Sequence, residues 1–75
     1  MALSRGMCLL QPIRVKRGLT QEQLSKRIMR KTGVNISAAT ISLFETNKRP
    51  MTPLQMRAVC IALRTTEAKL YEWNE

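Results

Sequence analysis

The sequence contains no histidine, only two cysteines and only one each of Trp, Tyr and Phe among its 75 residues. Without histidine the chain lacks ligands that zinc fingers use and the imidazole group on which most acid–base catalysis depends. Cys8 and Cys60 are too few and too far apart for a disulfide framework. Cys60 is expected to be a small buried hydrophobe and Cys8 to be more exposed. We therefore expect no enzymatic activity, no metal and no other cofactor.

Long apolar runs are also missing. The longest, residues 58–63, is far too short to cross a bilayer. Arg5 and Gly6 interrupt the first residues before the apolar segment of a secretory signal could form. Neither end of the chain shows a bulky amphipathic helix or a lipidation signal. We expect a cytoplasmic protein that makes no contact with a membrane.

Acidic residues are scarce: five Asp and Glu face thirteen Lys and Arg, which gives a net charge of +8. Residues 1–31 hold eight of the basic residues and only one acid, Glu22, whereas residues 32–75 hold five basic and four acidic residues. A one-sided basic field attracts a polyanion and speeds the encounter with it. Nucleic acid is the expected polyanion, although a basic surface that only keeps the chain soluble is an alternative that the charge leaves open.

Helix-start and helix-stop residues divide the chain into short helical segments, with no strand expected. Thr20 followed by Gln23 forms a capping box, and Ser37 and Thr52 are further N-caps. Residues 1–8 are expected to form a flexible N-terminal arm. The predicted helices cover about residues 12–17, 21–31, 38–46 and 53–64, with a final short helix after Thr66 that contains Leu70, Tyr71 and Trp73.

The apolar positions of these helices predict one core. They recur at helical spacing, as Leu24 and Ile28 do, so they share one side of each helix. The residues expected to pack together are Ile13, Leu19, Leu24, Ile28, Ile41, Phe44, Met56, Val59, Leu63 and Leu70.

Two helices joined by a short turn, the second short and well capped, fit a helix-turn-helix, although many small bundles share this outline. The residue types in these segments are a more specific indication than the helical outline. IRVKRGLTQEQLS at residues 13–25, ISAATISLFE at 36–45 and NKRP at 47–50 resemble the Cro and phage-repressor helix-turn-helix family, also called the xenobiotic-response-element type. The resemblance covers about residues 9–71. It implies an all-α, lambda-repressor-like DNA-binding domain of five short helices over residues 9–75.

The sequence departs from the family pattern at three places. Residues 29–34 look like an insertion of about six residues, which we expect to lengthen the second helix because Arg30 and Lys31 are good helix formers. Ser25 replaces the usual small alanine. Asn47 replaces the usual glycine after the recognition helix and tolerates the same left-handed conformation.

In this family the recognition helix lies in the major groove, with its N-terminal residues on base edges. By position, the resemblance implies base contacts from Ala38, Ala39, Thr40, Ser42 and Leu43. This set contains no Gln, Asn or Arg for bidentate base contacts. We therefore predict recognition weighted toward thymine methyl groups and DNA shape, with hydroxyl groups bonding a base or a phosphate. The alternative is that Ala38 and Ala39 are only good helix residues.

Phosphate contacts are expected on both sides of the recognition helix. Gln21 starts the second helix, where free backbone N–H groups favour an anion. Lys48 and Arg49 follow the recognition helix, and Lys16 and Arg17 are further candidates. Any one of these charges alone could simply be solvated; as a cluster flanking the motif they point to DNA.

The resemblance gives Arg14 and Glu45 a structural role. At matching positions, the family forms an ion pair between the first helix and the end of the recognition helix. Arg14 would then not contact DNA. Removal of one partner would leave a partly buried charge unpaired, at a cost of about 3 kcal/mol.

Some apolar residues are not needed for the core. Leu54, Ala58 and Ile61 are expected on the outward face of the fourth helix, and Tyr71 and Trp73 near the C-terminus. An exposed apolar patch indicates a partner, and two recognition helices about 34 Å apart would read one face of a duplex. We predict a homodimer through these residues; alternatively, Trp73 folds back onto its own domain.

The expected function is that of a sequence-specific DNA-binding transcriptional regulator, an operator-binding repressor of the phage or mobile-element type. It would bind double-stranded DNA and occlude RNA polymerase, with activation by contact with the polymerase left open. The alternative is a protein-interaction module, an antitoxin or antirepressor that binds a toxin or a repressor. The sequence leaves open whether the basic stretch within residues 26–34 contacts DNA, a second protomer or only water.

Overall fold

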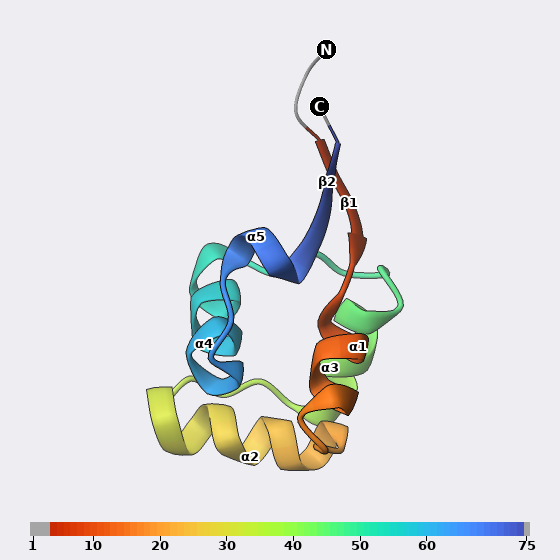
Figure 1. The fold of residues 1–75 in the computed structure, drawn as a ribbon. Coiled ribbons are helices and arrows are strands. Elements are labelled where there is room, and N and C mark those ends of the chain that lie inside the picture. The colour runs from red at the N-terminus through yellow and green to blue at the C-terminus, as the bar shows by residue number, and fades with distance from the viewer. Residues whose placement is uncertain (1–3, 75) are drawn as a thin grey trace.

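A computed structural model describes the backbone of residues 4–74 and the side chains of residues 8–71. Five helices follow one another, and a two-stranded ribbon brings the two ends of the chain together (Figure 1). The predicted all-α class with five short helices is confirmed, and the ribbon is an addition that the sequence did not predict. In chain order, the elements are β1 (Ser4–Cys8), α1 (Leu10–Lys16), α2 (Gln21–Thr32), α3 (Ala38–Glu45), α4 (Pro53–Leu63), α5 (Glu67–Leu70) and β2 (Tyr71–Asn74).

The three longest helices begin at the N-cap residues that the sequence predicts. Thr20 Oγ1 accepts a hydrogen bond from the backbone N–H of Gln23 at 3.1 Å, and Gln23 Oε1 accepts one from the Thr20 backbone N–H at 2.9 Å. Thr52 and Gln55 form the same capping box at the start of α4, and Ser37 caps α3. These bonds satisfy backbone donors that the first turn of a helix leaves unpaired, and so they fix where each helix starts.

Two residues in the left-handed conformation terminate α2 and α3. Gly33 ends α2 with a φ of 74°, and Asn47 follows α3 with a φ of 59°. Glycine and asparagine adopt this conformation more readily than other residues, as expected from the sequence. Asn47 Oδ1 also accepts a hydrogen bond from the backbone N–H of Cys8 at 2.9 Å. The end of α3 is therefore tied to β1.

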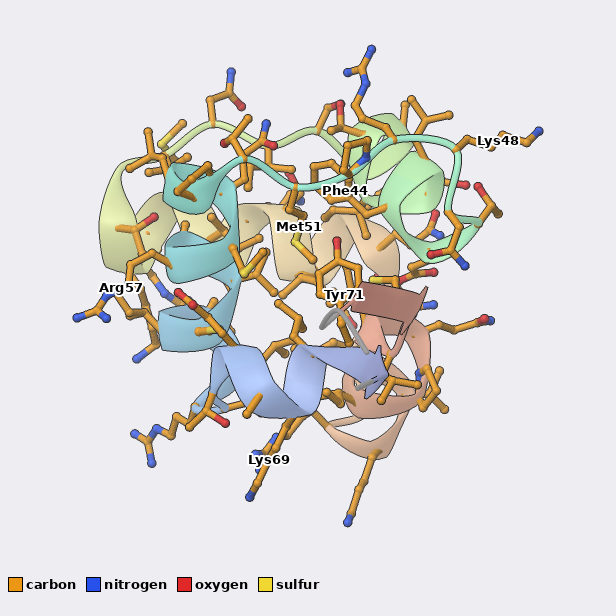
Figure 2. The ribbon with its side chains drawn as sticks, turned by 90° about the horizontal axis from the view of Figure 1, so that it is seen from above. Phe44, Lys48, Met51, Arg57, Lys69 and Tyr71 are labelled. Atoms are coloured by element: carbon orange, nitrogen blue, oxygen red, sulfur yellow. The ribbon has the colours of Figure 1, made fainter. Side chains whose placement is uncertain are left out.

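One hydrophobic core lies between the helices. Figure 2 shows Phe44, Met51 and Tyr71 pointing into it. Seven of the predicted core residues are buried, and the other three, Ile13, Leu19 and Met56, are partly buried and packed against the cluster. The predicted residues that are buried are Leu24, Ile28, Ile41, Phe44, Val59, Leu63 and Leu70.

The ends of the chain differ from the sequence-based expectation. Residues 4–8, expected in a flexible arm, form β1, and residues 71–74, expected to continue the last helix, form β2 antiparallel to it. The helix stops at Leu70 because Tyr71 is extended, with φ −133° and ψ 153°. The register shifts between Arg5 and Cys8, and the Leu70 carbonyl accepts a hydrogen bond from the Leu9 backbone N–H at 2.7 Å. The pairing of the two strands thus gives hydrogen-bond partners to backbone N–H and C=O groups that neither strand could satisfy alone.

Three residues expected at the surface are buried instead. Cys8 and Tyr71 are each 4% exposed because the ribbon packs over the core, and the backbone N–H of Met51 donates to the Tyr71 hydroxyl at 3.4 Å. Ala58 is 2% exposed because it belongs to the core cluster. The expectation that Cys8, Ala58 and Tyr71 are exposed is therefore wrong. The Trp73 side chain lies outside the described side chains.

Candidate nucleic-acid interface

Side-chain hydrogen bonds hold the short connection between α2 and α3 against α2. Ser25 Oγ donates to the Ile36 carbonyl at 2.6 Å, and Thr32 Oγ1 donates to the Ile28 carbonyl at 2.7 Å. The same Thr32 oxygen accepts from the Val34 backbone N–H at 3.1 Å. α2 therefore extends into the predicted insertion as far as Thr32, and residues 33–37 connect it to α3.

One side of α3 is turned away from the core. Ile41 and Phe44 are fully buried, whereas Ala39 is exposed and Ser42 and Leu43 are partly exposed on the opposite side of the helix. Thr46, the C-cap residue, is exposed and is one turn beyond Ser42, whose carbonyl accepts a hydrogen bond from Thr46 Oγ1 at 2.9 Å. We call Ala39, Ser42, Leu43 and Thr46 the outer face of α3.

The predicted base-contacting residues do not all lie on this face. Ala38 and Thr40 are partly exposed at its flanks, and Thr40 Oγ1 lies 2.9 Å from Ser37 Oγ, so its hydroxyl already has a partner. Thr46, which is not among the predicted base-contacting residues, also lies on this face. Its place one turn after Ser42 and Leu43 is the signal that could have found it. The outer face offers methyl and hydroxyl groups and no charge.

The only acid of α3, Glu45, is directed inward to a buried network. Glu45 Oε2 lies 2.7 Å from Nε of Arg14, and Oε1 accepts from Nη2 of Arg14 at 3.2 Å. Gln21 Nε2 donates to the same Oε1 at 3.0 Å, and Arg14 Nη1 donates to the Leu19 carbonyl. The side chains of Arg14 and Glu45 are 11% and 4% exposed. This network joins α1, α2 and α3, so it fixes the orientation of the outer face.

Three of the predicted phosphate-contacting residues gather near the C-terminal end of α3. Gln21 starts α2 and is held there by Glu45. Lys48 and Arg49 are exposed in the loop after α3, and their backbone N–H groups donate to the Leu43 carbonyl at 3.0 and 3.3 Å. Figure 2 shows the Lys48 side chain extending away from the molecule beside α3. The arrangement places the exposed charges of Lys48 and Arg49 and the amide group of Gln21 near the uncharged outer face of α3.

The structure does not bring Lys16 and Arg17 together with this group. Arg17 Nη2 points toward α4, where it lies 3.5 Å from the Arg64 carbonyl. Both residues line a hollow together with Arg64, Thr65 and Lys69, on the side of α1 that leads to α5.

Two large apolar residues of the predicted dimer patch are at the surface. Leu54 is 65% exposed and Ile61 is 47% exposed, two turns apart on the same side of α4. Val15 and Met29 are also exposed, on other helices. The patch is therefore smaller than predicted and centred on α4.

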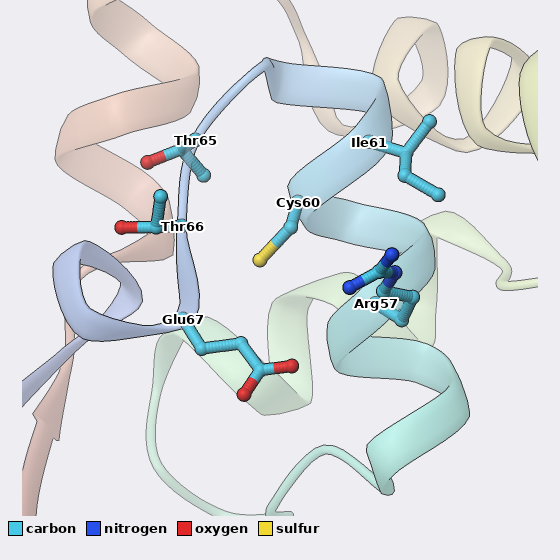
Figure 3. Close-up of a pocket in the computed structure, with 6 residues that line it drawn as sticks. All are labelled: Arg57, Cys60, Ile61, Thr65, Thr66 and Glu67. Carbon is cyan, nitrogen blue, oxygen red and sulfur yellow. The ribbon is translucent and has the colours of Figure 1, made fainter.

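Apart from these surfaces, the described residues offer few groups for a reaction or for binding a metal ion. Cys60 lies in a shallow pocket beside Arg57 and Glu67 (Figure 3), and burial raises the pKa of its thiol, so it is less reactive than a free cysteine. Among the described side chains of residues 8–71, no three His, Cys, Asp or Glu are grouped to hold a metal ion. None of the described helices combines the length and apolar character needed to cross a bilayer.

The comparison with protein families agrees with this geometry. A helix-turn-helix family model matches residues 11–70, from α1 to the last residue of α5. Comparison with curated proteins and with solved structures found no match. The matched segment spans most of the chain and includes both helices of the motif. The chain therefore belongs to the Cro and phage-repressor type of the helix-turn-helix family, and it is a DNA-binding transcription regulator.

Proposed function

We propose that this regulator is an operator-binding repressor of the phage or mobile-element type, which reads double-stranded DNA with the outer face of α3. The observation that carries the proposal is the exposure of Ala39, Ser42 and Leu43 on a helix anchored by the Arg14–Glu45 pair. A rigidly held helix with short side chains enters a major groove deeply, because nothing long or charged keeps it away. Occupying a promoter in this way would exclude RNA polymerase.

The contacts divide into two kinds with different consequences. The methyl groups of Ala39 and Leu43 and the hydroxyl group of Ser42 face the base edges, where apolar groups discriminate thymine through its C5-methyl group. The Thr46 hydroxyl group is already bonded to the Ser42 carbonyl, so Thr46 offers its methyl group. Gln21, Lys48 and Arg49 bind phosphate groups, which set the register of the helix on the duplex without reading sequence. The backbone donors at the start of α2 add to the attraction for phosphate.

We also propose that the repressor acts as a homodimer through Leu54 and Ile61. Both side chains are exposed on the same side of α4, and a two-fold axis near them would pair each copy with the same surface of its partner. Two recognition helices then contact half-sites about one helical turn apart. Antitoxin or antirepressor binding to another protein through the same α4 surface is the alternative use of these two residues.

Selection from a randomised duplex pool tests both proposals. A repressor of this kind enriches a two-fold symmetric sequence with half-sites about one helical turn apart. The variant Leu54→Glu/Ile61→Glu is expected to sediment as a monomer and to lose the symmetry requirement, whereas Val15→Glu/Met29→Glu, which changes two other exposed apolar residues, keeps both. Absence of any enriched sequence would contradict the repressor proposal. An enriched but unpaired half-site would contradict the dimer alone.

A further inference from the structure

A second basic surface lies across the molecule from the outer face of α3. Three adjoining hollows define it, each lined by basic side chains from α1, α2, α4, α5 or the connections between them. We call it the rear basic surface. Its charged members are Lys16, Arg17, Lys26, Arg27, Arg30, Arg64 and Lys69.

The hollows form one continuous surface because they share residues. Arg17 and Arg64 line both the hollow beside Lys69 and the next one, which reaches Arg27. Arg27 in turn lines the third hollow, with Lys26 and Arg30. More than half of the thirteen basic residues of the chain are thus gathered on this side.

Hydrogen bonds and helix geometry place this surface away from α3. On α2, Ser25 and Gln21 face the α3 side, since Ser25 donates to Ile36 and Gln21 to Glu45. Arg27 and Arg30 lie on the other flank of α2, about half a turn away around the helix. Figure 2 shows the same separation, with Lys48 beside α3 and Lys69 on the far side of the molecule.

The thickness of the domain prevents one straight duplex from touching both sides. The molecule measures 39 × 20 × 19 Å, and Lys69 lies on the side of the domain away from α3 (Figure 2). The rear charges therefore cannot serve as phosphate contacts of the operator that α3 reads unless that DNA is wrapped around the protein.

The chemistry of the rear basic surface fits a phosphate backbone better than a protein. None of the residues that line the three hollows is acidic, and Glu67, the acid nearest in sequence to Lys69, lines a different hollow with Arg57 (Figure 3). The four large exposed apolar residues of the described chain do not line these hollows either. Protein interfaces have apolar and aromatic centres, whereas phosphate recognition needs only clustered positive charge.

One member of this surface, Arg27, is half-buried. The Nε atom of Arg27 is buried and has no hydrogen-bond partner within the described part of the chain. Arg27 also lines one hollow together with Ala62, Leu63 and Arg64, so its side chain lies beside the end of α4.

We infer that the rear basic surface binds the phosphate backbone of a second DNA duplex, so that the protein bridges two segments of DNA. This inference rests on the proposed function, because it takes the first duplex to be the one at α3. In a two-fold dimer both recognition helices face the same duplex, which leaves both rear surfaces directed away from it. Bridging would bring distant DNA segments together without any additional domain.

A two-duplex retention assay tests this inference with the full chain. One 30-base-pair duplex (roughly three helical turns) carrying the selected sequence is immobilised, and a second, labelled duplex of random sequence is added with the protein. The test variant is Arg17→Gln/Lys69→Gln, and the matched control is Lys31→Gln/Arg57→Gln, which removes one Arg and one Lys outside the three hollows. Binding of each variant to the immobilised duplex alone is measured in parallel.

The wild-type protein is expected to retain the labelled duplex, and retention should weaken roughly tenfold to a hundredfold in the test variant, because two phosphate contacts are lost. The control variant should retain the label within about twofold of the wild type, and both variants should bind the single duplex equally well. The inference is overturned by absence of bridging in the wild type, by equal losses in both variants, or by a parallel loss of single-duplex binding in the test variant. Failure to select any sequence in the first place would count against the proposed function instead.

Discussion

The outer face of α3 and the rear basic surface are opposite in chemistry as well as in position. The first is a single helix face with short, uncharged side chains, and a buried ion pair orients it. The second is assembled from several elements, carries seven long charged side chains and has no acidic residue within its hollows. Sequence discrimination needs short groups held close to base edges, whereas attraction to phosphates tolerates mobile charges at a distance.

Under the proposed function, the net charge of this domain does not indicate which face reads the sequence. Only Lys48 and Arg49 provide positive charge in the loop after α3. Most of the excess lies across the molecule, where it can increase the rate and strength of DNA association but cannot distinguish base pairs.

The largest expected effect comes from removing the ion pair that orients the outer face. Arg14→Met leaves the Glu45 carboxylate buried without its main partner, which should lower the free energy of unfolding by about 3 kcal/mol. For a domain of this size the melting temperature should fall by roughly 15 °C. Thermal unfolding followed by circular dichroism measures the change. Arg30→Met, on the exposed rear surface, is the control and should cost no more than about 0.5 kcal/mol; similar losses in both variants would show that the pair does not stabilise the fold.

The next largest effect separates DNA affinity from stability. Ala39→Glu places a carboxylate on the outer face of α3, where it would repel phosphates and lack a base partner, so affinity should fall about a hundredfold. Gln55→Glu adds the same charge in the first turn of α4, where glutamate also completes a capping box, and it should bind like the wild type. Fluorescence anisotropy with the selected duplex gives both affinities. Equal weakening by the two substitutions would show that only net charge matters.

A smaller effect is expected in the salt dependence of binding to a single duplex. Lys48→Gln/Arg49→Gln should reduce the slope of log affinity against log salt by about 2, because each lost phosphate contact releases about one counterion fewer. Arg17→Gln/Lys69→Gln should leave this slope unchanged, since those residues lie on the rear basic surface. If the rear variant lowers the slope and the loop variant does not, the assignment of the two surfaces is reversed.

The smallest expected effect is confined to one position of the operator. Ser42→Ala removes one hydroxyl group from the outer face and should relax selectivity at one base pair of each half-site by about 1 kcal/mol. Repeating the selection with this variant measures the change. Thr66→Ala removes an exposed hydroxyl group that makes no capping hydrogen bond on α5, and it should leave every base preference as it is. Unchanged preferences in the Ser42 variant would remove Ser42 from the recognition set.

The sequence predicted the parts of the fold that local chemistry determines. Thr20 with Gln23, Ser37 and Thr52 each act through backbone groups within three residues, so their helix starts can be read from the chain. The left-handed conformation of Asn47 is also predictable locally, because asparagine tolerates it better than most residues. The Arg14–Glu45 contact came from the family resemblance, since nothing in the spacing of two residues on different helices reveals it.

The missed features depend on contacts between distant parts of the chain. The ribbon forms only when the folded helices bring residues 4–8 and 71–74 together, and neither segment has a strong strand pattern of its own. Burial of Cys8 and Tyr71 follows from that pairing. The position of Arg17 was also not predictable, because it depends on how α1 lies against the end of α4.

Replacing thymine by uracil in the selected operator tests most directly the claim that the outer face of α3 reads DNA. Uracil lacks only the C5-methyl group, so each replacement deletes one apolar contact and preserves base pairing. At one or more positions of each half-site, the affinity should fall about fivefold to tenfold (roughly 1 kcal/mol or slightly more). That loss should disappear in a Leu43→Ala or an Ala39→Gly variant, because the partner of the methyl group is then missing. If every replacement leaves the affinity within about twofold, α3 does not recognise thymine through its outer face, and the claim that this face reads the operator through methyl contacts is contradicted.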